Sequence, residues 1–305
     1  MKQWLHNNPV AGGFWLAGIG TVLFSLKGIL IKLAYQQGIT PDVLMALRML
    51  FAFPFYAVIA FLSFPKQSSH LTSVNAIKVA VYGLLGYYLA SILDVYGLVY
   101  VSASLERIIL YTYPVMVLLL SVVFLKSPFD NKLGLCIVII YGGLLLVFSA
   151  QPVVQDNERS RLLHGSELVL ASAFCYSIYL VGTETMIRIF PNRFYTACAM
   201  LMAAVAMFVH ASLRIPSGVL LQQANSIYGL CLLIAIFCTV LPSFFVSAGI
   251  QRIGATKAGV IGNIGPIVTL VLGNLLLGET LTTVQLGGFA VVIGGVYWLS
   301  QHKAA

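Results

Sequence analysis

Ten runs of predominantly apolar residues, each about twenty residues long, constrain this chain more than any other feature. A helix of about 20 residues crosses a hydrocarbon core of about 30 Å, and lipid requires every backbone polar group to be bonded internally. Only 9% of the 305 residues are charged, against roughly a quarter in soluble domains. We therefore expect an all-α integral membrane protein of ten transmembrane helices. The runs lie near residues 14–36, 42–64, 76–98, 104–125, 131–149, 165–187, 193–213, 226–250, 257–277 and 283–300.

The basic residues are distributed unevenly between the two ends of these spans. Because lysine and arginine collect in cytoplasmic loops, the bias predicts a cell (inner or plasma) membrane protein with both termini in the cytoplasm. The basic residues form no stripe, which argues against a nucleic-acid partner. The expected cytoplasmic residues are Lys2, Lys66, Lys78, Lys126, Lys132, Arg188, Arg193, Arg252, Lys257 and Lys303. The opposite side has Arg159, Arg161 and Arg214.

Displacing the chain by 152 positions brings similar segments into register. Tyr113-Pro114-Val115 then meets Gly265-Pro266-Ile267, and Gly97-Leu98 meets Gly249-Ile250. Five spans is an odd number, so a second copy enters the membrane from the opposite side, and its loops carry the opposite charge bias. We therefore predict two inverted five-helix repeats enclosing a site in the middle of the membrane. The expected units are residues 1–150, a polar linker at 151–163, and residues 164–305.

The segment Leu23–Leu50 resembles the first helical hairpin of the EamA-type family in the drug/metabolite transporter superfamily. Lys32 and Ala46-Leu47-Arg48 match the family's lysine and its Ala-x-Arg, whereas Phe24 and Lys27 replace the usual tryptophan and asparagine. A short turn and a helix ending at proline occur twice, at 102–114 and 254–266, and Gly278-Glu279 precedes Gln285-Leu286-Gly287. The resemblance covers essentially the whole chain. It implies a transporter, and members resemble exporters of amino acids, other metabolites or drugs.

Charged residues within the spans are the first candidates for a binding site. Together they would cost roughly 15 kcal/mol if they faced lipid unpaired, so we expect them to face the interior. Asp94 and Arg107 lie at similar depth, which permits an ion pair that either fixes the hairpin or lines a cavity for a charged or zwitterionic substrate. A protonatable Asp94 or Glu106 would also allow coupling to protons. The residues concerned are Lys27, Asp94, Glu106, Arg107 and Glu184.

A second group of candidates is polar but uncharged. Tyr88, Tyr111 and Tyr176 lie deep within spans, where a buried hydroxyl requires a partner, and Asn263 is a polar group deep in the ninth span. These residues suit a polar cavity, although local packing explains the tyrosines equally well. Pro114 and Pro266 predict either symmetric hinges or static kinks, and Lys32 and Arg48 are expected to extend toward the membrane boundary.

Other classes of function fit the sequence less well. An enzyme would need clustered acids or histidines, and the five histidines match no metal spacing, so we expect no cofactor and no metal. A channel would need a short re-entrant segment. The leading hypothesis is export of small metabolites such as amino acids by alternating access, and the alternatives are nucleoside-like or cationic metabolites or drugs, or a non-transporting structural or signalling protein. A monomer or weak dimer is expected, because ten helices can close their own cavity.

Overall fold

The computed structural model describes residues 9–65, 72–125, 131–150, 156–246, 248–249, 252, 261 and 264–302. All regular secondary structure in these ranges is helical. The first half comprises α2 (Pro9–Gln36), α3 (Pro41–Leu62), α4 (Ser73–Gly83), η2 (Leu84–Leu89), α5 (Ala90–Tyr100), α6 (Ala103–Leu110), α7 (Tyr113–Leu125) and α8 (Asn131–Ser149). The second half comprises α9 (Asp156–Met186), α10 (Asn192–Arg214), η3 (Val219–Leu221), α11 (Asn225–Ala235), η4 (Ile236–Val240), α13 (Ile264–Leu277) and α14 (Thr283–His302).

The helices follow the apolar runs of the sequence closely. Six helical stretches of the described chain are long and apolar enough to cross a membrane, and three shorter apolar helices accompany them. The prediction of an all-helical membrane fold is therefore confirmed. The long stretches are Ala11–Gln36, Pro41–Leu62, Ser73–Tyr100, Glu158–Thr183, Asn192–Arg214 and Asn225–Val246, and the shorter ones are Gly134–Ser149, Ile264–Leu277 and Thr283–Trp298.

The polar segment expected as a linker is largely helical. Of residues 151–163, the last eight belong to α9, which begins at Asp156 about nine residues before the sixth apolar run. Glu158, Arg159 and Ser160 are exposed there, so a polar first part of the helix extends the apolar span. Apolar periodicity detects the segment that contacts lipid or protein, and it misses this solvated extension.

Several spans depart from a regular α-helix at related positions. The third span changes to a π-helix at Leu84–Leu89, and the eighth does so at Ile236–Val240. These two segments coincide when the chain is displaced by the same 152 positions as in the sequence comparison. The fourth span is broken between α6 and α7 at Tyr111-Thr112, and Pro114 lies in the first turn of α7, where proline is tolerated. The break therefore precedes the proline.

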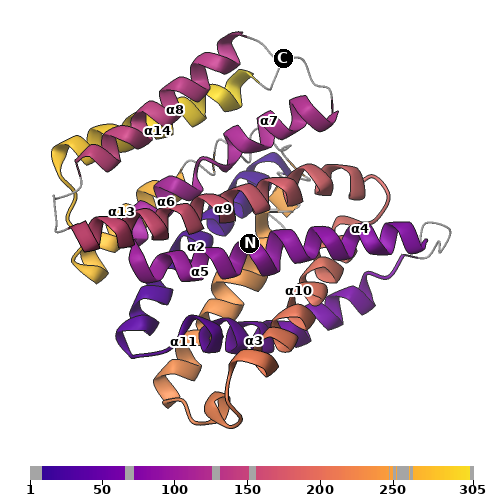
Figure 1. Ribbon diagram of the computed structural model, residues 1–305. Helices are drawn as coiled ribbons and strands as arrows, with labels where there is room; N and C mark the ends of the chain where they lie inside the picture. Colours follow the sequence, from indigo (N-terminus) through magenta and orange to yellow (C-terminus); the bar gives the residue numbers. More distant parts are fainter. Residues whose placement is uncertain are drawn as a thin grey trace.

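The two halves are packed against each other along their whole length (Figure 1). α8 and α14 form a pair at one edge, and α3 and α10 form a pair on the opposite side. Other contacts occur in matched sets, since α9 packs on η2 and α7, while α2 packs on η4 and α13. Exchanging the halves converts each set into the other, which is the packing expected of an internal repeat.

Glycines permit the closest approaches between the halves. A Cβ on Gly143 of α8 would lie 2.9 Å from the carbonyl oxygen of Gly288 in α14, so the two backbones come almost into contact. Large apolar side chains cover the outside instead, and Phe61 and Leu213 are 81% and 79% exposed. An apolar exterior with small residues at helix crossings is the arrangement that a lipid environment favours.

Candidate functional site

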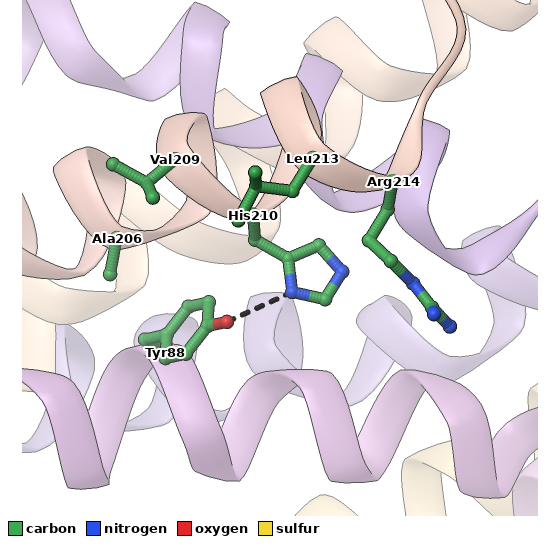
Figure 2. Close-up of a pocket in the computed structure, with 6 residues that line it drawn as sticks. All are labelled: Tyr88, Ala206, Val209, His210, Leu213 and Arg214. Carbon is green, nitrogen blue, oxygen red and sulfur yellow. Dashed lines mark hydrogen bonds between the residues drawn. The ribbon is translucent and has the colours of Figure 1, made fainter.

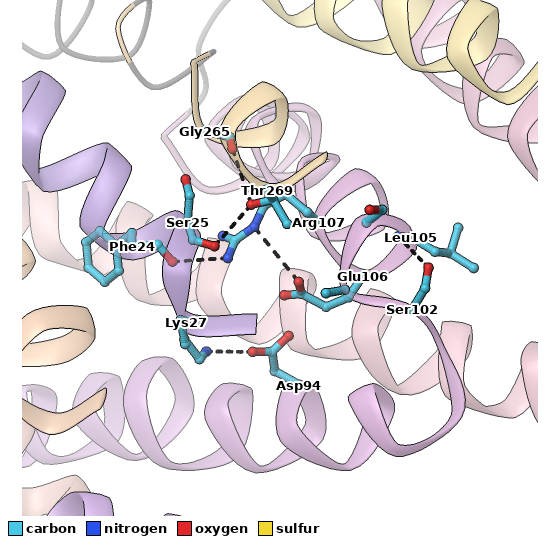
Figure 3. Close-up of polar contacts among 12 residues, drawn as sticks. Phe24, Ser25, Lys27, Asp94, Ser102, Leu105, Glu106, Arg107, Gly265 and Thr269 are labelled. Atoms are coloured by element: carbon cyan, nitrogen blue, oxygen red, sulfur yellow. Dashed lines mark hydrogen bonds and ion pairs between the residues drawn. The ribbon is translucent and has the colours of Figure 1, made fainter. Parts of the chain in front are cut away.

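An ion pair links the first and third spans in the centre of the bundle. Lys27 Nζ on α2 lies 2.5 Å from Asp94 Oδ2 on α5, and the two side chains are 17% and 2% exposed. Figure 3 shows the pair beside the first turns of α6. A buried carboxylate is stable only when it is paired and hydrogen-bonded, so Lys27 accounts for the presence of Asp94 at this depth.

The short helix α6 adds a second carboxylate and a second cation to this cluster. Arg107 Nη2 donates to the carbonyl oxygen of Phe24 over 3.1 Å, and Arg107 Nε lies 3.9 Å from Glu106 Oε2. Gly28 of α2 leaves room for the carboxylate, because a Cβ there would lie 3.2 Å from Glu106 Oε2. Nearby, Thr269 of α13 donates to the carbonyl oxygen of Ser25 over 3.1 Å, so both halves reach this part of α2.

Arg48 is a buried cation that the sequence reading misplaced. We expected it to extend toward the membrane boundary, but it is 2% exposed, and it interacts electrostatically with Asp94. The reading failed because an apolar run gives the depth of a residue approximately and does not show which face of the helix is packed. Its Nε has no hydrogen-bond partner in the described part of the chain.

Four buried polar atoms in this region lack hydrogen-bond partners in the described part of the chain. Two are donors, Arg48 Nε and Arg107 Nε, and two are acceptors, Asp94 Oδ1 and Glu106 Oε2. An unsatisfied buried polar group costs about 1–3 kcal/mol. We call Lys27, Arg48, Asp94, Glu106 and Arg107 the central cluster. It combines donors and acceptors that lack hydrogen bonds, and two of these atoms, Arg107 Nε and Glu106 Oε2, face each other as an ion pair at 3.9 Å.

The structure separates the predicted site residues into groups. Lys27, Asp94, Glu106 and Arg107 come together in the central cluster, but Asp94 pairs with Lys27 and not with Arg107 as expected. Similar depth permitted the Asp94–Arg107 pair, but depth alone does not determine which side chains meet. Asn263 and the side chain of Glu184 lie outside the described residues.

Tyr111 and Tyr176 belong to a row of tyrosine rings that begins one helical turn beyond Arg107. The ring of Tyr113 lies between them, with centroids 6.1 Å from Tyr111 and 5.5 Å from Tyr176. The row continues from Tyr176 through Tyr179 to Tyr195, with centroid separations of 5.8 and 6.2 Å. It thus runs from the break between α6 and α7 across α9 to α10 as a continuous and largely buried row of aromatic rings.

Tyr88 lies apart from the central cluster, at a hollow of about 450 Å³ between the third span and α10 (Figure 2). Its hydroxyl is 2.9 Å from His210 Nδ1, and His210 Nε2 is 3.1 Å from Asp42 Oδ1. A carboxylate only accepts, so Nε2 carries a hydrogen, and in the neutral ring Nδ1 accepts from Tyr88. This series of hydrogen bonds links α10 to α3 and to the third span.

Glu279 joins the second half to the beginning of α6. Its carboxylate accepts from Ala103 N (2.7 Å), Ser104 N (3.0 Å) and Ser104 Oγ (2.7 Å). The next amide, that of Leu105, donates to Ser102 Oγ over 3.1 Å. The first amides of a helix have no partner within the helix, so these contacts satisfy them and fix the helix that carries Glu106 and Arg107.

A cavity of about 710 Å³ lies at the same end of the bundle, which we call the Glu279 end. Its lining comes from the end of α2, the turn before α3, the end of α5 and the turn after α13. Lys32 and Glu279 are its charged residues. No group of three or more histidine, cysteine or acidic residues that could hold a metal occurs in the ranges that the structure covers.

Comparison with known proteins gives consistent matches along the chain. The model of the EamA-like transporter family matches residues 11–149 and 164–301. The uncharacterized transporter YcbK of Bacillus subtilis is 31% identical over 286 residues, covering 92% of this chain and 89% of the relative. An uncharacterized transporter of Archaeoglobus fulgidus is 25% identical, covering 99% of this chain and all of the relative (100%). A WAT1-related protein of Arabidopsis thaliana is 25% identical over 300 residues, covering 88% and 83%.

A crystal structure of a protein of 15% sequence identity has the same fold. The two structures superpose with a TM-score of 0.64, covering 96% of this chain and 99% of the other. The arrangement of helices is thus known from experiment in a distant relative, and this likeness concerns the fold alone.

Proposed function

We propose that this chain, which belongs to the EamA-like transporter family, exports small zwitterionic metabolites of the amino-acid class. Membership of this family makes the protein a multi-pass membrane transporter. The identity of the solute and the direction of transport are our proposal. They rest on the chemistry of the central cluster and on the resemblance to metabolite exporters.

The observation that carries this proposal is the mixture of unmatched atoms in the central cluster. Arg48 Nε and Arg107 Nε are donors suited to a carboxylate, and Asp94 Oδ1 and Glu106 Oε2 are acceptors suited to an ammonium group. An α-amino acid presents both groups on neighbouring carbon atoms. Its binding would satisfy atoms of both kinds, and each charge-assisted hydrogen bond contributes about 1.5–3 kcal/mol.

The charges of the cluster favour a zwitterion or an anion over a cation. Lys27, Arg48 and Arg107 face two carboxylates, so the fully ionised cluster has one positive charge more than negative charges. A cationic solute would increase this excess of positive charge in a site of low dielectric constant. The alternative of cationic metabolites or drugs is therefore the less favoured.

The tyrosine row supports solutes with an apolar or aromatic side chain. It begins at Tyr111, one turn beyond Arg107, and continues through Tyr113 and Tyr176. Aromatic rings pair edge to face at centroid separations of 4.5–7 Å, and a solute ring adjoining Arg107 would extend this row. Neutral and aromatic amino acids are the solutes that we expect to bind most tightly.

The paired packing of the halves supports alternating access around the central cluster. Each half would adopt in turn the conformation of the other, which exposes the cluster first to one side and then to the other. The bias of basic residues supports an orientation with both termini in the cytoplasm and the Glu279 end outside. Asp94 and Glu106 are the groups that would carry a proton if transport is coupled to protons.

The proposal is tested by solute counterflow in vesicles of purified protein. The test solutes are phenylalanine, which has both charged groups, and three analogues. Its N-acetyl derivative retains only the carboxylate, whereas its amide and phenylethylamine retain only the ammonium group. We expect exchange of phenylalanine, weak competition by the N-acetyl derivative, and none by the two cations. Arg107→Leu should abolish exchange, and Arg193→Gln, a change at an exposed arginine, should preserve it. Equal competition by all four solutes would overturn the zwitterion assignment.

A further inference from the structure

We propose that the cavity at the Glu279 end is a second solute site, separate from the central cluster, in which Lys32 binds the carboxylate of the solute. The inference rests on the proposed transport of amino-acid-like solutes and adds a first binding step on the path to the centre. The cavity has a volume of about 710 Å³, which accommodates a solute of amino-acid size. Both halves contribute to its lining, so its shape changes when they move.

The cavity is lined by one cation, Lys32, and one anion, Glu279, and they differ in whether hydrogen bonds already engage them. Glu279 is the acidic residue of the lining, and its carboxylate already accepts from Ala103 N, Ser104 N and Ser104 Oγ. Lys32 is half-buried and interacts electrostatically with Glu279 and Glu106, but it makes no hydrogen bond with any residue that the structure describes. An ammonium group left in this position attracts a carboxylate.

Most other polar groups of the lining are already engaged. The hydroxyl of Tyr35 donates to the carbonyl oxygen of Val95 over 2.6 Å, and Ser102 Oγ accepts from Leu105 N. The ring of Tyr100 packs against the ring of His164 at 5.2 Å between centroids. The guanidinium of Arg161 also lies over the ring of Tyr100, 5.8 Å from its centroid. Tyr35 therefore presents a ring surface that suits the apolar part of a solute, and Lys32 supplies the specificity for an anionic group.

The position of Lys32 connects this cavity to the central cluster. Lys32 follows Lys27 by five residues on α2, a rise of about 7.5 Å along the helix. Gly28 lies between them, and Glu106 occupies the space beside it. The cavity therefore lies about one and a half helical turns from the central cluster, and the Glu106 carboxylate separates the two cations.

The test measures occupancy of the cavity directly and does not require transport. Thr40 lines the cavity, is exposed, and makes no side-chain capping bond, so Thr40→Cys places a thiol there at little cost. Purified protein is labelled with an anionic and with a cationic methanethiosulfonate, with and without 3-phenylpropionate or its uncharged amide. The protein with threonine at position 40 gives the background labelling of the native cysteines.

We expect 3-phenylpropionate to slow labelling of Thr40→Cys at least about threefold when it is in excess, and its amide to have no effect. Adding Lys32→Gln to the Thr40→Cys variant should remove this protection. It should also reduce the ratio of the labelling rate of the anionic reagent to that of the cationic reagent about tenfold. Lys32→Arg should retain both properties, and Lys78→Gln, at an exposed lysine of α4, should change neither. Equal protection by acid and amide, no protection, or an unchanged ratio in Lys32→Gln would each overturn the site. The labelling experiment does not depend on counterflow. It therefore tests the cavity even if the protein does not exchange amino acids.

Discussion

Replacing Asp94 by leucine should destabilise the protein strongly, because it leaves Lys27 buried without its partner. The Asp94 carboxylate is 2% exposed and lies 2.5 Å from Lys27 Nζ. Breaking a buried ion pair from one side costs about 3–5 kcal/mol. Lys27 is 17% exposed, so water offsets part of this cost, and a value of about 3 kcal/mol is expected.

The partner substitution should cost less. In Lys27→Met the Asp94 carboxylate retains Arg48 and Arg107 as neighbouring cations, and we expect a loss of about 1–2 kcal/mol. The double variant Lys27→Met/Asp94→Leu removes both charges and should unfold within about 1 kcal/mol of the wild type. The two single effects should therefore exceed the double effect by at least about 2 kcal/mol.

The assay is thermal unfolding of purified protein in detergent, combined with counterflow in vesicles. At about 2–4 °C per kcal/mol, Asp94→Leu should unfold roughly 6–12 °C below the wild type. Glu167→Gln, a change at an exposed carboxylate of α9, is the control and should unfold with the wild type. Additive single effects would refute the reasoning, because the pair would then contribute no coupling. A double variant that is stable and also transports would show that the pair is structural only.

Three further substitutions test other parts of the structure. Arg48→Leu removes a buried cation with an unsatisfied Nε, so unfolding measurements should show a gain of about 1 kcal/mol or more, while solute-induced stabilisation shows binding at least about tenfold weaker. Glu279→Ala should lower the free energy of unfolding by about 1.5–3 kcal/mol, because it leaves the first amides of α6 without hydrogen-bond acceptors. Glu279→Gln keeps one acceptor oxygen and should cost about half as much. Equal losses in the two variants would contradict the hydrogen-bond assignment. A Cβ at Gly86 would overlap the ring of Tyr179, so Gly86→Leu should cost at least about 1–3 kcal/mol in the same unfolding assay. Gly142→Ala, where no atom lies within 4 Å of the added Cβ, should lose nothing.

The sequence predicted the membrane fold well because its strongest signal, apolar run length, is imposed by the thickness of the bilayer. The helix boundaries followed these runs to within a few residues, except where α9 extends into solvent at Asp156. The repeat was visible because similar short motifs recur at a constant spacing of 152 positions. These properties depend on local composition and on chain order, which a single sequence contains.

The side-chain partners were harder to predict because they depend on the rotation of each helix. Similar depth in the membrane suggested an Asp94–Arg107 pair, whereas Asp94 pairs with Lys27. Tyr88 lies within the π-helical segment Leu84–Leu89, where the regular spacing of side chains is interrupted, and it faces His210 instead of the centre. Arg48 was assigned to the boundary from its position in the second span, and that position does not show that its face of the helix is packed against the interior.

The matched π-helical segments also contain information about ancestry. A π turn arises when a helix accommodates one additional residue, and here it occurs at Leu84–Leu89 and again at Ile236–Val240. A single insertion that preceded a gene duplication explains both more simply than two later events at the same place. The ancestral chain then had five helices, and two copies of it had to insert in opposite directions to form this bundle. The opposite charges of equivalent loops would have become fixed after fusion, once each half had a single orientation to keep.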